Sequence, residues 1–75
     1  MYQVGQTIFA KQNWTVTAAL LSDHKVYGDL KCEMYMLQGK RGSEAMLMRQ
    51  VSKDGKVSPW TLARGIRSET VTVYV

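Results

Sequence analysis

Apolar and polar residues alternate with a period of two along most of this chain, which is the pattern of β-strands with one buried face. The alternation is clearest over residues 14–20 and over the closing residues 70–75, which also have high β-propensity. Residues 4–10 form a shorter candidate strand that begins beside Gly5. Residues 18–21, Ala-Ala-Leu-Leu, also suit a helical turn, because alanine and leucine are good helix formers. The pattern predicts an all-β fold and leaves that one alternative open.

The dipeptide Asp54-Gly55 is the strongest turn signal in the sequence, because both positions of a two-residue hairpin turn must tolerate a positive φ. Pro59 cannot donate a hydrogen bond to a neighbouring strand, so we expect its strand to lie at an edge or to contain a bulge there. A two-residue turn at Asp54-Gly55 pairs Lys53 with Lys56, Val51 with Ser58, Arg49 with Trp60, Leu47 with Leu62 and Ala45 with Arg64.

The turn Gly39-Lys40-Arg41-Gly42 constrains its register less, because its loop can contain an odd or an even number of residues. An even-length loop places the methionines opposite other residue types. With an odd-length loop, both hairpins place the same residues on the same face, and we predict that register. Its pairs are Leu37 with Ala45, Met36 with Met46, Tyr35 with Leu47, Met34 with Met48 and Glu33 with Arg49.

The two hairpins together predict a three-stranded sheet with two different faces. Arg49 lies on the first face, where it can form a cation–π contact with Trp60 and an ion pair with Glu33. The apolar residues of this face are Tyr35, Leu37, Leu47, Val51, Trp60 and Leu62, which we predict to form the core. The second face carries Met34, Met36, Met46 and Met48. These methionines are either a contact surface or, if a tightly curled sheet makes both faces internal, flexible gap-fillers.

These elements predict a single domain over residues 1–75 with an all-β fold. Its architecture is a five- to six-stranded, strongly curved antiparallel sheet or a small barrel. The loop 22–31 and the two hairpins connect the first five strands as a meander. The C-terminal strand, residues 70–75, either closes the barrel or adds to the sheet edge of a neighbouring chain.

The opening Val4-Gly5-Gln6, the strand around Trp14-Thr15-Val16, and the hairpins at 39–42 and 54–55 follow one another in an order that resembles an SH3-like small barrel. The resemblance covers about residues 3–65 and concerns topology alone. Some such barrels are enzymes, as in the type II dihydrofolate reductases, but the Val-Gln-Ile-Tyr segment of that family is absent here. The resemblance therefore implies a fold and transfers no functional residue.

The chain has 75 residues, which is enough for one domain with a small core. Cys32 is the only cysteine and His24 the only histidine, so we expect neither an intramolecular disulfide nor a structural zinc site. A chain of this size without such a link often depends on a partner subunit, and we expect a homo-oligomer. No apolar run approaches the roughly 20 residues that span a bilayer, and the first ten residues do not resemble a signal peptide. We expect a cytoplasmic protein with no membrane partner.

The formal charge of +4 is unevenly placed along the chain. Positive and negative residues cancel over 1–37, so the whole excess lies in residues 38–75. The basic residues of this second half are Lys40, Arg41, Arg49, Lys53, Lys56, Arg64 and Arg67. Such asymmetry favours a polyanionic or acidic partner. The alternative is a basic surface that only keeps the protein in solution.

No catalytic constellation is evident in the sequence. Cys32 and His24 are separated by a predicted loop with no pattern that brings them together, and the carboxylates of that loop have no evident apolar pocket. The turn 39–42 could bind phosphate through its backbone N–H groups, but it lacks the glycine spacing and the following helix of a nucleotide-binding loop. We expect no enzyme activity, no cofactor and no metal.

The remaining interpretation is a non-catalytic binding module. We expect the seven basic residues of the second half to bind nucleic acid, or an acidic surface of nucleic-acid machinery, with little sequence specificity, because Tyr35 and Trp60 belong to the core. The alternative function is a self-associating structural or adaptor protein that uses the four methionines. Small chains with few motifs are common among phage and mobile-element accessory proteins, and this frequency alone suggests that class of protein.

Overall fold

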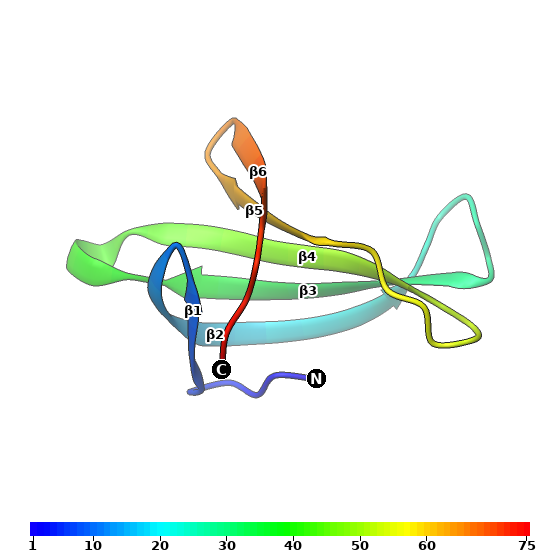
Figure 1. The fold of residues 1–75 in the computed structure, drawn as a ribbon, viewed down its shortest axis with the longest axis horizontal. Coiled ribbons are helices and arrows are strands. Elements are labelled where there is room, and N and C mark those ends of the chain that lie inside the picture. Colours follow the sequence, from blue (N-terminus) through cyan, green and yellow to red (C-terminus); the bar gives the residue numbers. More distant parts are fainter.

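A computed structural model describes all 75 residues. Six strands form one antiparallel sheet, and their order in the sheet is their order in the sequence. Figure 1 shows how these strands are arranged. The strands are β1 (Thr7–Ala10), β2 (Gln12–Asp23), β3 (Leu30–Gln38), β4 (Glu44–Ser52), β5 (Trp60–Arg64) and β6 (Arg67–Val71). A single 3₁₀ turn, η1 (Lys40–Gly42), joins β3 to β4. The all-β prediction is confirmed.

The sheet curls into a half-barrel whose two edges meet at one point. The long strands β2, β3 and β4 lie side by side, and the residues after β6 run back across them toward β1 (Figure 1). There the Phe9 N–H donates to the Tyr74 carbonyl at 2.8 Å, and the Tyr74 N–H donates to the Phe9 carbonyl at 2.9 Å. Of the two roles that we expect for the C-terminal residues, this contact favours closure of the sheet.

The last strand differs in its bounds from the expected strand over residues 70–75. It begins at Arg67, because Gly65 takes a φ of 60° and allows a two-residue turn in which Arg64 pairs with Arg67. It ends at Val71, and Tyr74 then forms only an isolated bridge. The sequence therefore contains a further tight hairpin, which the expected strand over residues 70–75 did not include.

The register between β3 and β4 is the predicted one. Met34 lies opposite Met48, Met36 opposite Met46, Tyr35 opposite Leu47, Leu37 opposite Ala45 and Glu33 opposite Arg49. The turn η1 allows this odd-length connection because Arg41 and Gly42 both take left-handed backbone conformations, with φ of 60° and 72°. Every second residue of these two strands therefore points to the same face.

The hairpin between β4 and β5 is predicted correctly at its far end and wrongly near its turn. Leu47 pairs with Leu62 as expected, but Val51 bridges to Val57 and not to Ser58. The Ser52 N–H donates to the Lys56 carbonyl at 2.8 Å, which encloses three residues where the prediction has two. The register returns to the predicted one after Pro59, so the expected irregularity lies at this point. There the Gln50 N–H donates to Ser58 Oγ at 2.8 Å.

The helical alternative for residues 18–21 is wrong, because these residues lie within β2. The pairing of β2 with β3 shifts between Val16 and Ala18, so β2 contains a β-bulge at this point. A bulge bends its strand and increases the local twist. This irregularity accompanies the curl that carries β1 over the inner face of the sheet.

The core lies on the inner face of the half-barrel. Five of the six predicted core residues are buried, namely Tyr35, Leu37, Leu47, Trp60 and Leu62. Val51 is only half-buried, since it lies near the β4–β5 loop, beyond the paired residues of β5. The rest of the core comes from the terminal strands and their neighbours, namely Ile8, Ala10, Trp14, Val16, Ala45 and Val71.

Candidate functional site

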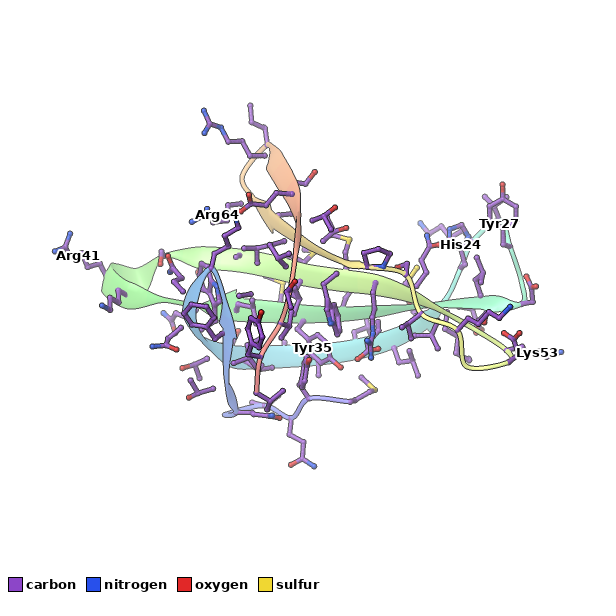
Figure 2. All side chains as sticks on the ribbon, in the orientation of Figure 1. His24, Tyr27, Tyr35, Arg41, Lys53 and Arg64 are labelled. Atoms are coloured by element: carbon purple, nitrogen blue, oxygen red, sulfur yellow. The ribbon has the colours of Figure 1, made fainter.

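Six of the seven basic residues of the second half lie at three separate turns. Figure 2 shows Arg41 at one end of the long axis, Lys53 at the other end and Arg64 on the β5–β6 hairpin, away from both. The molecule is 38 Å long, several times the Debye length of about 8 Å at physiological salt. Lys40 and Arg41 lie together at η1, Lys53 and Lys56 in the β4–β5 loop, and Arg64 and Arg67 beside the β5–β6 turn. The structure does not bring these pairs into one continuous patch.

Arg49 differs from the other six, because its guanidinium is engaged inside the sheet. Its Nε donates to the buried Glu33 carboxylate at 2.9 Å, and its Cζ lies 4.1 Å from the centre of the Trp60 ring. Both predicted contacts of Arg49 are confirmed. Glu33 also accepts a hydrogen bond from the Tyr35 hydroxyl. Arg49 therefore neutralises a buried carboxylate, and its charge is not available beside the surface cations.

The same network raises the pKa of Tyr35 to about 12. Burial of the phenol is the main cause, and its hydrogen bond to Glu33 is the second. The Tyr2 N–H donates to the Tyr35 hydroxyl oxygen at 3.1 Å, and burial also raises the pKa of Tyr2. This network joins the N-terminal residues to β3 and β4, and it leaves no buried polar side-chain atom without a partner.

Carboxylates lie close to only some of the surface cations. The Lys56 Nζ lies 4.0 Å from Asp54, and Glu69 lies 3.7 Å from both Lys11 and Arg64. These exposed pairs contribute little to stability and are screened by salt. Lys40, Arg41, Lys53 and Arg67 form no ion pair. Two cations share one carboxylate at Glu69, so positive charge remains in excess there.

A hollow of about 590 Å³ lies beside the turn η1. Gly39 lets this turn approach β2, since a Cβ atom at residue 39 would lie 2.8 Å from the Trp14 ring and from Gln12 Nε2. The two cations of η1 thus lie next to amide groups of the β1–β2 hairpin. The lining residues are Phe9, Gln12, Asn13, Lys40, Arg41 and Ser43.

A second hollow, of about 360 Å³, shares Phe9 with the first. Its lining residues are Phe9, Lys11, Thr70, Val71, Thr72 and Tyr74. We refer to the two hollows together as the β1 groove. Its walls contain the cations Lys11, Lys40 and Arg41 and two aromatic side chains, and no carboxylate lines either hollow. The groove is the place where cations, hydrogen-bonding groups and exposed rings meet on this molecule.

Of the residues that line the β1 groove, only Lys40 and Arg41 were among the predicted site residues, and the other nine, including Phe9, Lys11 and Tyr74, were not. One local signal was available: Phe9 and Lys11 both alternate with the buried Ile8 and Ala10, so they point outward. The contribution of Tyr74 has no local signal, because it depends on the closing contact with Phe9.

The four methionines lie on the outer face of the sheet, opposite the core. Met36 is 40% exposed, and Met34, Met46 and Met48 are half-buried. Leu20, which is 54% exposed, pairs with Met34 and extends this apolar surface onto β2. We call these five residues the methionine face. The exposure of Met36 and Leu20 favours a contact surface over gap-fillers of an internal core.

The other candidate groups have simple local roles. His24 Nδ1 accepts the N–H groups of Val26 and Tyr27, each at 3.1 Å, within the β2–β3 loop. Cys32 is half-buried on β3. No three metal-ligating side chains cluster anywhere in the structure, and no helix has the length and apolarity needed to cross a membrane.

Comparison with known proteins finds no match to this chain among protein-family models, curated proteins or solved structures. The functional argument therefore starts from the β1 groove and the methionine face. Of these two surfaces, only the groove combines charge with hydrogen-bonding groups and a concave shape.

Proposed function

We propose that this protein is a non-catalytic nucleic-acid-binding module built on a small SH3-like half-barrel. The observation that supports it best is the β1 groove, in which Lys40 and Arg41 line one hollow and Lys11 lines the other, with no carboxylate among the lining residues. Of these three cations, only Lys11 has a carboxylate within 4 Å, that of Glu69. Cations in such a groove replace the counterions of a phosphate backbone, and release of those counterions drives association. An acidic protein surface is the competing ligand.

The groove favours nucleic acid over an acidic protein because of what lies between its cations. Gln12 and Asn13 present amide groups, which can donate hydrogen bonds to phosphate or base edges. The Ser43 hydroxyl beside them donates to the Lys40 carbonyl at 2.9 Å. Contacts to phosphate fix the position of a strand but carry no sequence information. We therefore expect binding that is strongly salt-dependent and weakly sequence-specific.

The test compares charge reversal at the two ends of the molecule. We expect Lys40→Glu with Arg41→Glu to weaken binding of a labelled oligonucleotide by about tenfold or more at low salt, and to reduce the dependence of affinity on salt. Lys53→Glu with Lys56→Glu is the matched control, because it makes the same change in net charge at the opposite end (Figure 2). Fluorescence anisotropy at several salt concentrations measures both.

Three results would contradict the proposal. Equal loss in both double variants means that net charge, and not the groove, determines binding. Absence of oligonucleotide binding by the wild-type protein at low salt removes the nucleic-acid function altogether. Tighter binding of poly-glutamate than of the oligonucleotide assigns the groove to an acidic protein.

Self-association is a second candidate function, and the methionine face supports it. The face is apolar and lies on the outer side of the sheet, opposite the core, where Met36 and Leu20 are exposed. Only 12 of the 75 residues are buried, so a second copy on this face would enlarge a small core. The two functions are compatible, because a dimer carries two β1 grooves.

A further inference from the structure

The two exposed rings of the β1 groove are held in a fixed arrangement. The side chains of Phe9 and Tyr74 are 43% and 61% exposed, and their ring centroids lie 6.3 Å apart with the planes inclined at 50°. The backbone hydrogen bonds that close the sheet join these same two residues. The rings are therefore kept at the surface by main-chain contacts and not by burial.

No other aromatic residue has this setting. Tyr2, Trp14, Tyr35 and Trp60 belong to the core or pack against it. Tyr27 is exposed in the β2–β3 loop, where its ring lies 5.2 Å from that of His24, at the end of the molecule opposite Arg41 (Figure 2). Phe9 and Tyr74 are thus the aromatic pair that lies among the groove cations.

We propose that the β1 groove binds single-stranded nucleic acid, with unpaired bases stacked on Phe9 and Tyr74 and the backbone phosphates held by Lys11, Lys40 and Arg41. This inference rests on the proposed function and specifies its ligand. An aromatic ring attracts the face of a base, and this face is accessible in a single strand and covered by neighbouring bases in a duplex. Stacking tolerates every base, which agrees with the absence of a specific base-reading arrangement.

The geometry favours separate stacking on each ring. Because the two ring planes are inclined at 50°, they do not form one flat platform, and each ring receives its own base. Phe9 lines both hollows, so a strand that extends from one hollow to the other passes beside its ring. Lys11 lies on one side of Phe9, and Lys40 and Arg41 lie on the other, which places cations along the path on both sides.

A different element suits duplex DNA, and it provides the competing outcome. The β5–β6 hairpin carries a fully exposed Ile66 at its turn, between Arg64 and Arg67. An apolar side chain between cations can insert between base steps in a minor groove. This hairpin has one apolar side chain and no exposed ring, so the observations favour the β1 groove and a single strand.

The experiment separates bases from phosphates. Anisotropy titrations compare an oligothymidylate of about 12 nucleotides with an abasic strand of the same length, which keeps the phosphates and lacks the bases. We expect the wild-type protein to bind the oligothymidylate about tenfold more tightly than the abasic strand. Phe9→Leu should reduce this difference, because Tyr74 still offers one ring, and Phe9→Leu with Tyr74→Leu should remove it. Phe9→Trp should keep the difference. Tyr27→Leu, the matched control, should keep the difference.

Each other outcome has a definite meaning. Equal affinity of the wild-type protein for the two strands overturns the stacking inference and leaves the proposed function standing, and this comparison needs no variant. No binding to either strand removes the proposed function as well. Tighter binding of a duplex than of the oligothymidylate, with loss of that binding in Ile66→Ser, assigns recognition to the β5–β6 hairpin and overturns the inference.

Discussion

Lys11 and Arg41 are the only residues other than glycine with a positive φ, at 69° and 60°, and both line the β1 groove. A side chain in the left-handed region costs about 1–2 kcal/mol relative to an ordinary conformation, because Cβ approaches a carbonyl oxygen. Glycine adopts this conformation without that cost. Both cations therefore lie at positions where glycine would adopt the same backbone conformation at lower cost.

The prediction at this scale is that Arg41→Gly makes the protein more stable and a weaker binder. We expect the free energy of unfolding to rise by about 1 kcal/mol, since relief of the backbone strain exceeds the entropy that glycine adds to the unfolded chain. Urea denaturation measures stability, and anisotropy measures affinity. Lys53→Gly removes a cation from a turn residue without positive φ and should give no gain in stability. A loss of stability in Arg41→Gly would show that the residue is not strained.

Strand β3 contributes both to the core and to the methionine face, because its residues alternate between the two faces of the sheet. Glu33, Tyr35 and Leu37 point into the core, while Met34 and Met36 point outward. The inward residues join three parts of the chain, since Tyr35 contacts Tyr2 and Glu33 while Arg49 of β4 bonds to the same carboxylate. A shifted register would separate the buried Glu33 carboxylate from Arg49 and leave its charge unpaired, so this network favours the observed register of β3 and β4.

The prediction at the scale of this element is a loss of stability at high pH. The pKa of Tyr35 is about 12 in the folded protein and near 10 in the unfolded chain, so only the unfolded chain loses this proton between those values. The stabilisation is therefore complete below pH 10 and is lost as the pH rises toward 12, by on the order of 2 kcal/mol. Denaturation at a series of pH values measures this slope.

Tyr35→Phe is the control for that slope. The variant is expected to be less stable at neutral pH, because Glu33 loses a donor, but its stability should fall less between pH 10 and 12. An identical slope in both proteins would show that other groups cause the alkaline loss. Absorbance of the phenolate in the folded protein gives an independent measurement of the same pKa.

The sequence predicted these elements where local pairing patterns determine them. The β3–β4 register followed from matching residues across η1, and the contacts of Arg49 with Glu33 and Trp60 followed from that register. The β4–β5 turn was predicted with one residue too few, because the Ser52 side chain accepts the Lys56 N–H at 3.0 Å and stabilises a wider loop. A side-chain hydrogen bond of this kind leaves no trace in the pattern of apolar residues.

At the scale of the whole molecule, the curl of the sheet determines which surfaces exist. It separates the basic turns along a length of 38 Å. It also brings β1 and the C-terminal residues together into a groove that no local sequence pattern predicts. The contact between Phe9 and Tyr74 is non-local, so sequence periodicity predicts that both are strand residues but not that they are neighbours. The same curl leaves the methionine face on the outside.

The prediction at this scale concerns the methionine face. We expect Met36→Lys with Met46→Glu to abolish self-association while strand content is kept, because the two residues are cross-strand partners and the new charges can pair within one chain. Sedimentation velocity at high salt measures the oligomeric state, and circular dichroism measures strand content. The same distribution of species in the wild-type protein and the variant would exclude this face as the interface.

The pair of hydrogen bonds between Phe9 and Tyr74 also covers part of the β1 border of the sheet, while the outer border of β6 has no partner strand. An open sheet of this kind would present unpaired N–H and C=O groups along β1 at one side and along β6 at the other, and such borders recruit further strands into aggregates. Loss of this contact would thus expose the whole border of β1 and enlarge the surface on which another strand can add. A ligand that lies over both rings would hold this contact shut, so the proposed binding surface and the protection against aggregation coincide.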